Sequence, residues 1–267
     1  MELFQVRTYG PSPCRAAVLH GGPGAIGSAA GLARGLAESC GVLEPLQSKY
    51  SVTEQVEELH RQLTAYASRP LVLIGHSWGA WLAALYAARH PGLAARLVLI
   101  GCGPLEAAYL PQLEARRLAH FTPEEAARYR ELLAALSSPG SAPDALLRQL
   151  GTLCEKADNF QPFEEPDGDS GTIDGEMYDK VFGEAAELRR DERLLAAFDR
   201  ISCPLEIIHG VYDTHPPEGV TEPLARRGIP YTFHLLEQCG HTPWRERYAR
   251  DEFFRLLNDA VRNAESQ

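Results

Sequence analysis

Short apolar runs alternate along the chain with segments in which apolar residues recur every three to four positions. Apolar runs bounded by turn residues are typical of strands buried on both faces, whereas the longer period predicts amphipathic helices. The predicted strands are residues 3–9, 16–20, 71–74, 96–100, 204–210 and 229–237. The predicted helices outside the middle of the chain are residues 27–39, 52–68, 78–89 and 243–264. This alternation indicates an α/β fold with a mostly parallel central sheet and helices on both faces.

The strand pattern stops between about Pro104 and Arg200. Leu and Ala recur there at helical spacing, and residues 121–136 open with Thr-Pro-Glu-Glu, a capping-box start. The stretch SSPGSAPD then separates this helix from the next one. We therefore expect residues 104–200 to form a helical cap or lid, inserted into a core built from residues 1–103 and 201–267.

Composition and charge narrow the possible functions. The chain of 267 residues carries 26 Lys and Arg against 36 Asp and Glu, a net charge of −10. This charge disfavours nucleic acids and anionic membrane surfaces as partners, and the first residues resemble no targeting segment, so we expect a cytoplasmic protein. No pair of cysteines has metal-ligand spacing, which predicts reduced structural thiols and no metal site. The six cysteines are Cys14, Cys40, Cys102, Cys154, Cys203 and Cys239.

A Gly-x-Ser-x-Gly motif joins a predicted strand to a predicted helix at Ser77. A sharp turn at this junction strains the serine backbone, and Gly75 and Gly79 remove side chains that would collide with the flanking elements. The turn would expose the hydroxyl of Ser77 at the carboxyl end of the sheet. We therefore expect Ser77 to be a nucleophile; the alternative is an ordinary helix-capping serine.

A nucleophilic serine needs a base and a group that orients the base. His241 follows the last predicted strand, and Asp213 follows the strand before it, so both should lie at the carboxyl edge of the sheet. Together they complete the chain order Ser, Asp, His. His215 is the rival base in the loop of Asp213, and Glu106 is the rival acid.

The stretch HGGPG, residues 20–24, follows another predicted strand. Its glycines let the backbone approach a ligand closely, and it lacks the lysine and the spacing of a phosphate-binding loop. We expect the amides of Gly22 and Trp78 to form an oxyanion hole, the donor pair that stabilises charge on an attacked carbonyl oxygen.

The motifs HGGPG, GHSWGA, HGVYD and CGHTPW occur in this order across most of the chain. The set resembles the α/β-hydrolase superfamily, and within it the prolyl iminopeptidase-like group. The resemblance implies the α/β-hydrolase fold, a helical cap and a cofactor-free serine hydrolase. It assigns Ser77 as nucleophile, Asp213 as orienting acid, His241 as general base, and Gly22 with Trp78 as oxyanion hole.

Residues 155–179 contain nine Asp and Glu residues against one Lys. This stretch is either a solvated loop or a lid whose carboxylates attract a substrate amine. The candidate substrate contacts are Glu164, Glu165, Phe160, Phe163, Tyr178 and Trp244. The expected activity is hydrolysis of a small ester or amide, including an N-terminal aminoacyl bond, in a small-molecule or short-peptide substrate. A non-peptidase carboxylesterase or thioesterase, a carbon–carbon bond hydrolase, and a ligand-binding relative with little turnover stay open.

Overall fold

A sheet of seven strands forms the centre of the computed structural model, which describes residues 5–67, 70–136, 143–164 and 172–264. Its strand order is β1-β4-β2-β5-β6-β8-β9, and every neighbouring pair is parallel except β1 with β4. These strands are β1 (Val6–Tyr9), β2 (Cys14–Leu19), β4 (Gly41–Pro45), β5 (Leu71–His76), β6 (Ala94–Ile100), β8 (Leu205–Gly210) and β9 (Thr232–Leu236). This arrangement confirms the predicted mostly parallel sheet.

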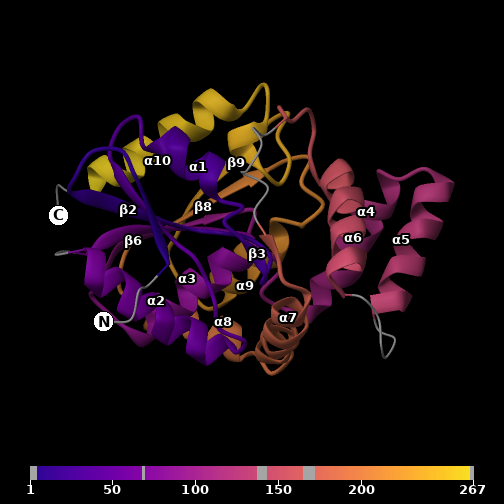
Figure 1. The fold of residues 1–267 in the computed structure, drawn as a ribbon, viewed down its shortest axis with the longest axis horizontal. Helices are drawn as coiled ribbons and strands as arrows, with labels where there is room; N and C mark the ends of the chain where they lie inside the picture. The colour runs from indigo at the N-terminus through magenta and orange to yellow at the C-terminus, as the bar shows by residue number, and fades with distance from the viewer. Residues whose placement is uncertain (1–4, 68–69, 137–142, 165–171, 265–267) are drawn as a thin grey trace.

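Helices cover both faces of the sheet (Figure 1). One face carries α1 (Ala30–Leu36) and α10 (Arg250–Asn263); the other carries α2 (Val52–Tyr66), α3 (Trp78–Arg89), α8 (Arg193–Ala197) and α9 (Glu218–Arg226). The central strands are almost wholly buried, since both of their faces pack against helices. None of the helices in the described part of the chain has the length and apolarity needed to span a membrane.

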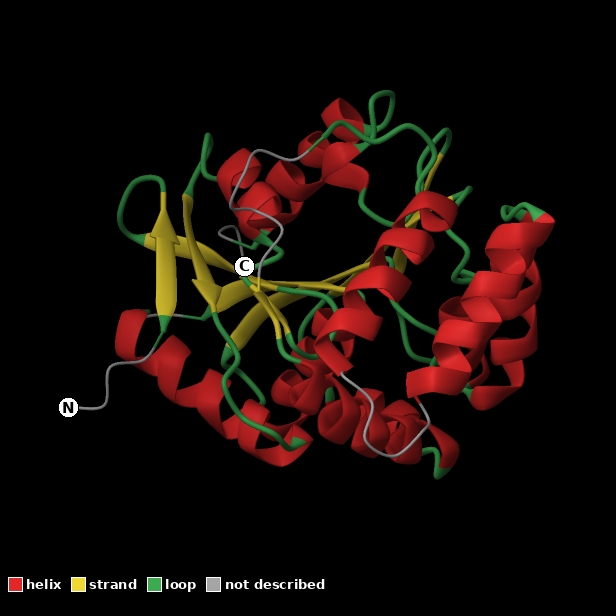
Figure 2. Ribbon diagram, turned by 45° about the vertical axis from the view of Figure 1, so that its right-hand side comes forward, coloured by secondary structure: helices red, strands yellow, loops and turns green. Residues whose placement is uncertain are grey.

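The segment between β6 and β8 is mainly helical, as its pattern predicts. It contains α4 (Leu110–Ala119), α5 (Pro123–Leu136), α6 (Pro143–Asp158) and α7 (Gly175–Arg190), and Figure 2 shows α4–α6 beside the sheet layers. Helices α5 and α6 share a small apolar cluster of their own, whereas α7 and α8 pack into the main core. Strand β7 (Thr172–Ile173) pairs with β3 (Ala25–Ile26). The domain boundaries at residues 104 and 200 stay a prediction.

The final helix and the strands β3, β4 and β7 differ from the sequence-based expectation. The final helix begins at Arg250 rather than at Pro243, because the Glu246 carboxylate accepts backbone hydrogen bonds from Gly240, Phe160 and Gln161 and holds a loop there. Before α10, residues Pro243–Arg245 form a short 3-10 turn. The same kind of turn occurs at Ala107–Tyr109 and Phe198–Arg200. Strand β4 was not predicted, since Gly41, Pro45 and the buried charge of Glu44 interrupt its apolar pattern.

Candidate active site

Ser77 lies between the end of β5 and the start of α3, with φ 53° and ψ −115°. A non-glycine residue at positive φ is strained, and such residues concentrate at functional sites. The turn is tight: a Cβ on Gly75 would lie 2.2 Å from the Gly79 carbonyl oxygen, and a Cβ on Gly79 would lie 2.3 Å from that of Leu19. Both glycines are therefore required by backbone packing around Ser77.

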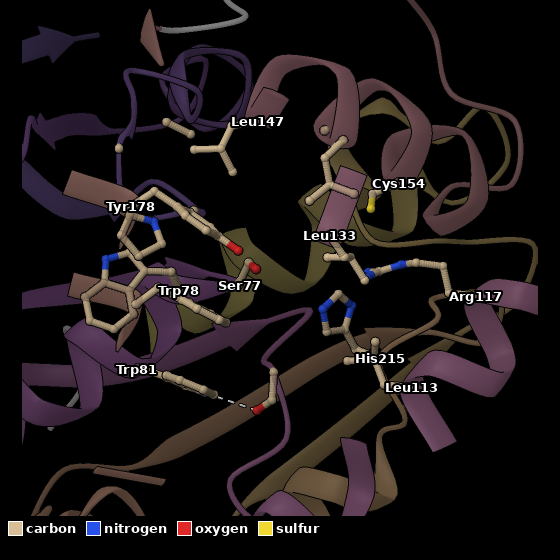
Figure 3. A pocket seen from close by; sticks show the side chains of 18 of the residues that line it. Ser77, Trp78, Trp81, Leu113, Arg117, Leu133, Leu147, Cys154, Tyr178 and His215 are labelled. Atoms are coloured by element: carbon tan, nitrogen blue, oxygen red, sulfur yellow. Dashed lines mark hydrogen bonds between the residues drawn. The ribbon is translucent and has the colours of Figure 1, made fainter. Parts of the chain in front are cut away.

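Ser77 lines a cavity of about 530 Å³ between the sheet edge and the helices of the inserted segment. Figure 3 shows Trp78, Trp81 and Tyr178 on one side of Ser77, and Arg117 and His215 on the other. Most of the wall is apolar; its aliphatic residues include Leu110, Leu113, Leu133, Leu147 and Leu150. The cavity can thus hold an apolar group of considerable size beside the serine.

Asp213 and His241 form a hydrogen bond at the carboxyl edge of the sheet. Nδ1 of His241 lies 2.8 Å from Oδ2 of Asp213, and Nδ1 must donate because an ionised carboxylate only accepts. His215 makes an equivalent bond, with its Nδ1 2.8 Å from Oδ1 of the same carboxylate. His209 is a third neighbour, with Nε2 3.3 Å from Oδ2. Asp213 therefore orients two imidazoles rather than one.

Burial and the neighbouring charges shift the pKa values of this cluster in opposite directions. Burial by itself would raise the pKa of Asp213, but the neighbouring imidazoles hold it well below its ordinary value. Burial would lower the pKa of His241, and the charge and hydrogen bond of Asp213 outweigh it and raise this pKa. For His215, burial dominates and lowers the pKa. Within the pair, His241 is the stronger base.

His241 lies close to the turn of Ser77. The amide of Ser77 donates to the carbonyl of Ile100 at 2.9 Å, and a Cβ on the next residue, Gly101, would lie 2.9 Å from Nδ1 of His241. The His76 ring, adjacent in sequence to Ser77, bonds the His241 carbonyl oxygen at 3.0 Å. Neither His241 nor His215 hydrogen-bonds the Ser77 hydroxyl in the described structure. Such catalytic bonds are often long without substrate.

The rival acid Glu106 and four other histidines have partners of their own. Glu106 forms an ion pair with Arg226 at 2.5 Å and makes no contact with His241 among the described interactions. His60 and His90 stack on each other beside Tyr86, near the C-terminal end of α3. His20 and His120 bond the carbonyl oxygens of Gly21 and Ala157, respectively.

The two residues predicted to form the oxyanion hole lie on the cavity wall. Gly22 and Trp78 both line it, and a Cβ on Gly21 would lie 3.1 Å from the Ser77 Cβ, so the glycine loop passes directly beside the serine. Gly22 has φ +55°, a conformation that glycine adopts without strain. Trp78 is the first residue of α3, and its amide has no acceptor within the helix. The arrangement leaves both amides available to a ligand.

The predicted cap contacts divide into three groups. Tyr178 lines the cavity. Phe160, Phe163, Glu164 and Trp244 are not among its described lining residues: Trp244 packs in the core against Phe253, Phe160 packs against Tyr212, and Phe163 and Glu164 are exposed. The structure does not bring these four side chains to the cavity: the chain after α6 turns toward the His241 loop, and Trp244 packs in the core, so their role as substrate contacts stays a prediction. Glu165 lies outside the described residues.

Two arginines that the sequence did not single out line the cavity, Arg117 from α4 and Arg189 from α7. Arg117 forms a bidentate pair with Asp158, with N···O distances of 2.9 and 2.7 Å. The Asp158 carbonyl oxygen accepts from the His241 amide at 2.8 Å, so this pair ties the inserted helices to the catalytic loop. Both arginines occupy ordinary helical positions, and no sequence signal separates them from surface arginines.

One group of described residues brings three possible metal ligands together: Asp213, His215 and His241, with ligand atoms within 4.8 Å of one another. Both Nδ1 atoms already donate to the carboxylate, so a metal would have to displace two hydrogen bonds.

Comparison with known proteins identifies the family of this chain. The profile described as the Alpha/beta hydrolase family matches residues 17–256. The monoacylglycerol lipase abhd6-B of Xenopus laevis is 27% identical over 229 residues, which are 81% of this chain and 63% of the relative; this chain thus spans less than two thirds of that protein.

Two solved structures share the fold. VinJ has a TM-score of 0.69 at 19% identity, and the match covers 97% of this chain and 94% of that chain. The proline iminopeptidase of Mycobacterium smegmatis has a TM-score of 0.67 at 18% identity, with the same coverage of both chains. Identities this low show the fold alone. The match to the family profile spans most of the sequence, and this chain belongs to the alpha/beta hydrolase family.

Proposed function

We propose that the protein is a serine hydrolase that cleaves a carboxylic ester through an acyl-serine intermediate. The observation that carries this proposal is the 2.8 Å hydrogen bond between Asp213 and His241, next to a serine held at positive φ between two required glycines. Asp213 keeps the proton on Nδ1 of His241, so Nε2 is free to accept the hydroxyl proton of Ser77.

The reaction then follows from these groups. Ser77 Oγ attacks the carbonyl carbon as its proton passes to His241, and the amides of Gly22 and Trp78 donate to the resulting oxyanion. The tetrahedral species collapses, and the leaving alcohol takes the proton from His241. Water, deprotonated by His241, then releases the acid and restores Ser77. The described residues supply every group in this cycle, so no cofactor is invoked.

The cavity favours an ester over an aminoacyl substrate. Its lining is mainly apolar and carries the guanidinium of Arg189, which no described carboxylate neutralises and which disfavours a free amine. Its described carboxylate, Asp174, already accepts from the Met177 amide and the Tyr50 hydroxyl. The relative named monoacylglycerol lipase also supports an ester. We further infer a small-molecule substrate, since the net charge of −10 disfavours polyanionic partners; the cytoplasmic location stays a prediction.

Hydrolysis of p-nitrophenyl butyrate, with fluorophosphonate labelling, tests the proposal. Ser77→Ala should abolish labelling and lower turnover by about 10³-fold or more, because triad residues act as a unit. Ser39→Ala is the control, since Ser39 is an exposed serine that bonds the Leu36 carbonyl oxygen. Labelling that persists in Ser77→Ala would identify another nucleophile. Wild type that neither labels nor turns over would support a ligand-binding relative instead.

A further inference from the structure

Arg189, in the last turn of α7, is a buried cation in the wall of the cavity. It is 8% exposed, and its Nε atom is buried without a hydrogen-bond acceptor. Burial lowers the pKa of its guanidinium, and no carboxylate of the described residues pairs with it. Buried cations are normally paired, because removing a charge from water is costly. Arg189 therefore carries an uncompensated positive charge.

Arg117, the second arginine of the cavity, has a partner of opposite charge. Arg117 shares two hydrogen bonds with Asp158, so its charge is neutralised within the protein. The guanidinium of Arg189 instead lies 5.3 Å from the centre of the Trp81 ring. A cation–π contact of this kind offsets only part of the cost of burial. Among the described lining residues, Arg189 alone thus gives the cavity a free positive charge.

The Trp81 ring fixes the position of the Arg189 guanidinium. Trp81 lies in the first turn of α3, which begins directly after Ser77, and both residues line the cavity. Its indole N–H donates to the Gly103 carbonyl oxygen at 3.1 Å, the dashed line in Figure 3, which prevents the ring from swinging away. Arg189 is therefore held over a fixed aromatic surface in the same cavity as Ser77.

We propose that Arg189 binds a carboxylate of the substrate while the ester carbonyl reacts at Ser77. This inference rests on the proposed function and names its substrate class: an ester that carries a carboxylate on an apolar spacer. A guanidinium presents donors in a planar fork that matches a carboxylate. One free positive charge balances one carboxylate, whereas a phosphate monoester dianion would bring one negative charge in excess. The apolar walls around both groups suit the spacer.

Matched ester pairs test this assignment on the acyl side. The mono-p-nitrophenyl esters of succinic, glutaric, adipic and suberic acid are compared with p-nitrophenyl esters of fatty acids of equal chain length. A second pair tests whether the carboxylate belongs to the alcohol part of the ester instead. Here the acidic ester is 4-acetoxybenzoate, and its neutral partner is 4-methylphenyl acetate. At the correct length, Arg189→Met should lower kcat/KM for the acidic ester by about 10-fold to 100-fold, as expected for a buried charged hydrogen bond. The neutral partner should change less than about twofold, because it makes no such bond.

Two further variants separate binding from structure. Arg189→Lys should retain part of the preference, and Arg190→Met, which removes the exposed neighbour on the same helix, should retain all of it. Arg189→Met should unfold at an equal or higher temperature than wild type, since it removes an unpaired buried charge. A loss of stability with equal loss on acidic and neutral esters would assign Arg189 a structural role and overturn the proposal.

Calorimetry on Ser77→Ala measures the site without turnover. The half-ester should bind this variant more tightly than its neutral partner, and the additional Arg189→Met change should remove the difference. Inorganic phosphate serves as the competing anion and should bind more weakly than the half-ester, which carries a single carboxylate. If the enzyme turns over neutral esters and prefers the acidic ester in none of the series, the carboxylate site is rejected and the hydrolase proposal is retained. Absence of all turnover, with preserved half-ester binding, would reject the hydrolase and retain the site.

Discussion

The imidazole rings of His215 and His241 stack on each other, with centroids 4.3 Å apart and an angle of 19° between the planes. Each donates from Nδ1 to a different oxygen of Asp213, so one carboxylate positions two parallel rings. His215 faces the cavity, and the backbone amide of His215 also donates to Asp213 at 2.9 Å. The pair raises the question of which ring accepts the proton of Ser77.

The two histidines should respond differently to removal. His241→Ala should lower kcat/KM for p-nitrophenyl butyrate by about 10³-fold or more, as expected for the base of a triad. His215→Ala should cost about 10-fold, because it removes a stacking partner and leaves Asp213 bonded to His241. Steady-state kinetics of both variants measures the difference. If His215→Ala is inactive and His241→Ala is not, His215 is the base.

Activity should increase with pH through a value above the ordinary 6.5 of histidine. Burial opposes the charge, but Asp213 raises the pKa of His241, and only the neutral imidazole can accept the proton of Ser77. In Asp213→Asn the raising charge is gone and burial remains, so the midpoint should move below 6.5 and the plateau should fall by about 10⁴-fold. The pH profile of kcat/KM checks both. A midpoint near 4, the range of a free carboxyl group, would contradict the mechanism.

Asp158→Asn should destabilise the protein by about 3–5 kcal/mol, because Arg117 would be left as an uncompensated buried charge. The side chains of this pair are 11% and 7% exposed. Urea unfolding gives the free energy. Glu252→Gln is the matched control: its partner Arg255 lies in an exposed pair, so the change should cost less than about 1 kcal/mol. Equal effects at the two sites would mean that Arg117 is solvated.

Gly79→Ala should destabilise the protein by more than about 2 kcal/mol, since its new Cβ would lie 2.3 Å from the Leu19 carbonyl oxygen and the backbone must move. Gly183→Ala, within α7, is the control. No atom lies within 4 Å of its new Cβ, so this change should stabilise the protein by about 0.4–1 kcal/mol. Thermal and urea unfolding of both variants test the packing of the Ser77 turn. A neutral Gly79→Ala would show that the turn is looser than described.

The sequence by itself determined six of the seven strands of the central sheet, the turn at Ser77 and the positions of Asp213 and His241 after their strands. These features depend on local patterns: the period of apolar residues selects strand or helix, and the glycines around Ser77 are needed by the backbone of one turn. Parallel strands then bring their carboxyl ends to one edge. Neighbours in sequence were enough to predict where this chemistry gathers.

Only the tertiary structure decided what surrounds that chemistry. Arg189 and Arg117 reach the cavity because α7 and α4 pack where they do, while Phe163, from the stretch expected to line the cavity, lies exposed. The start of α10 was displaced by hydrogen bonds that Glu246 accepts from residues more than eighty positions away. Such contacts join segments distant in sequence, and their energies depend on burial and partners that no local period encodes.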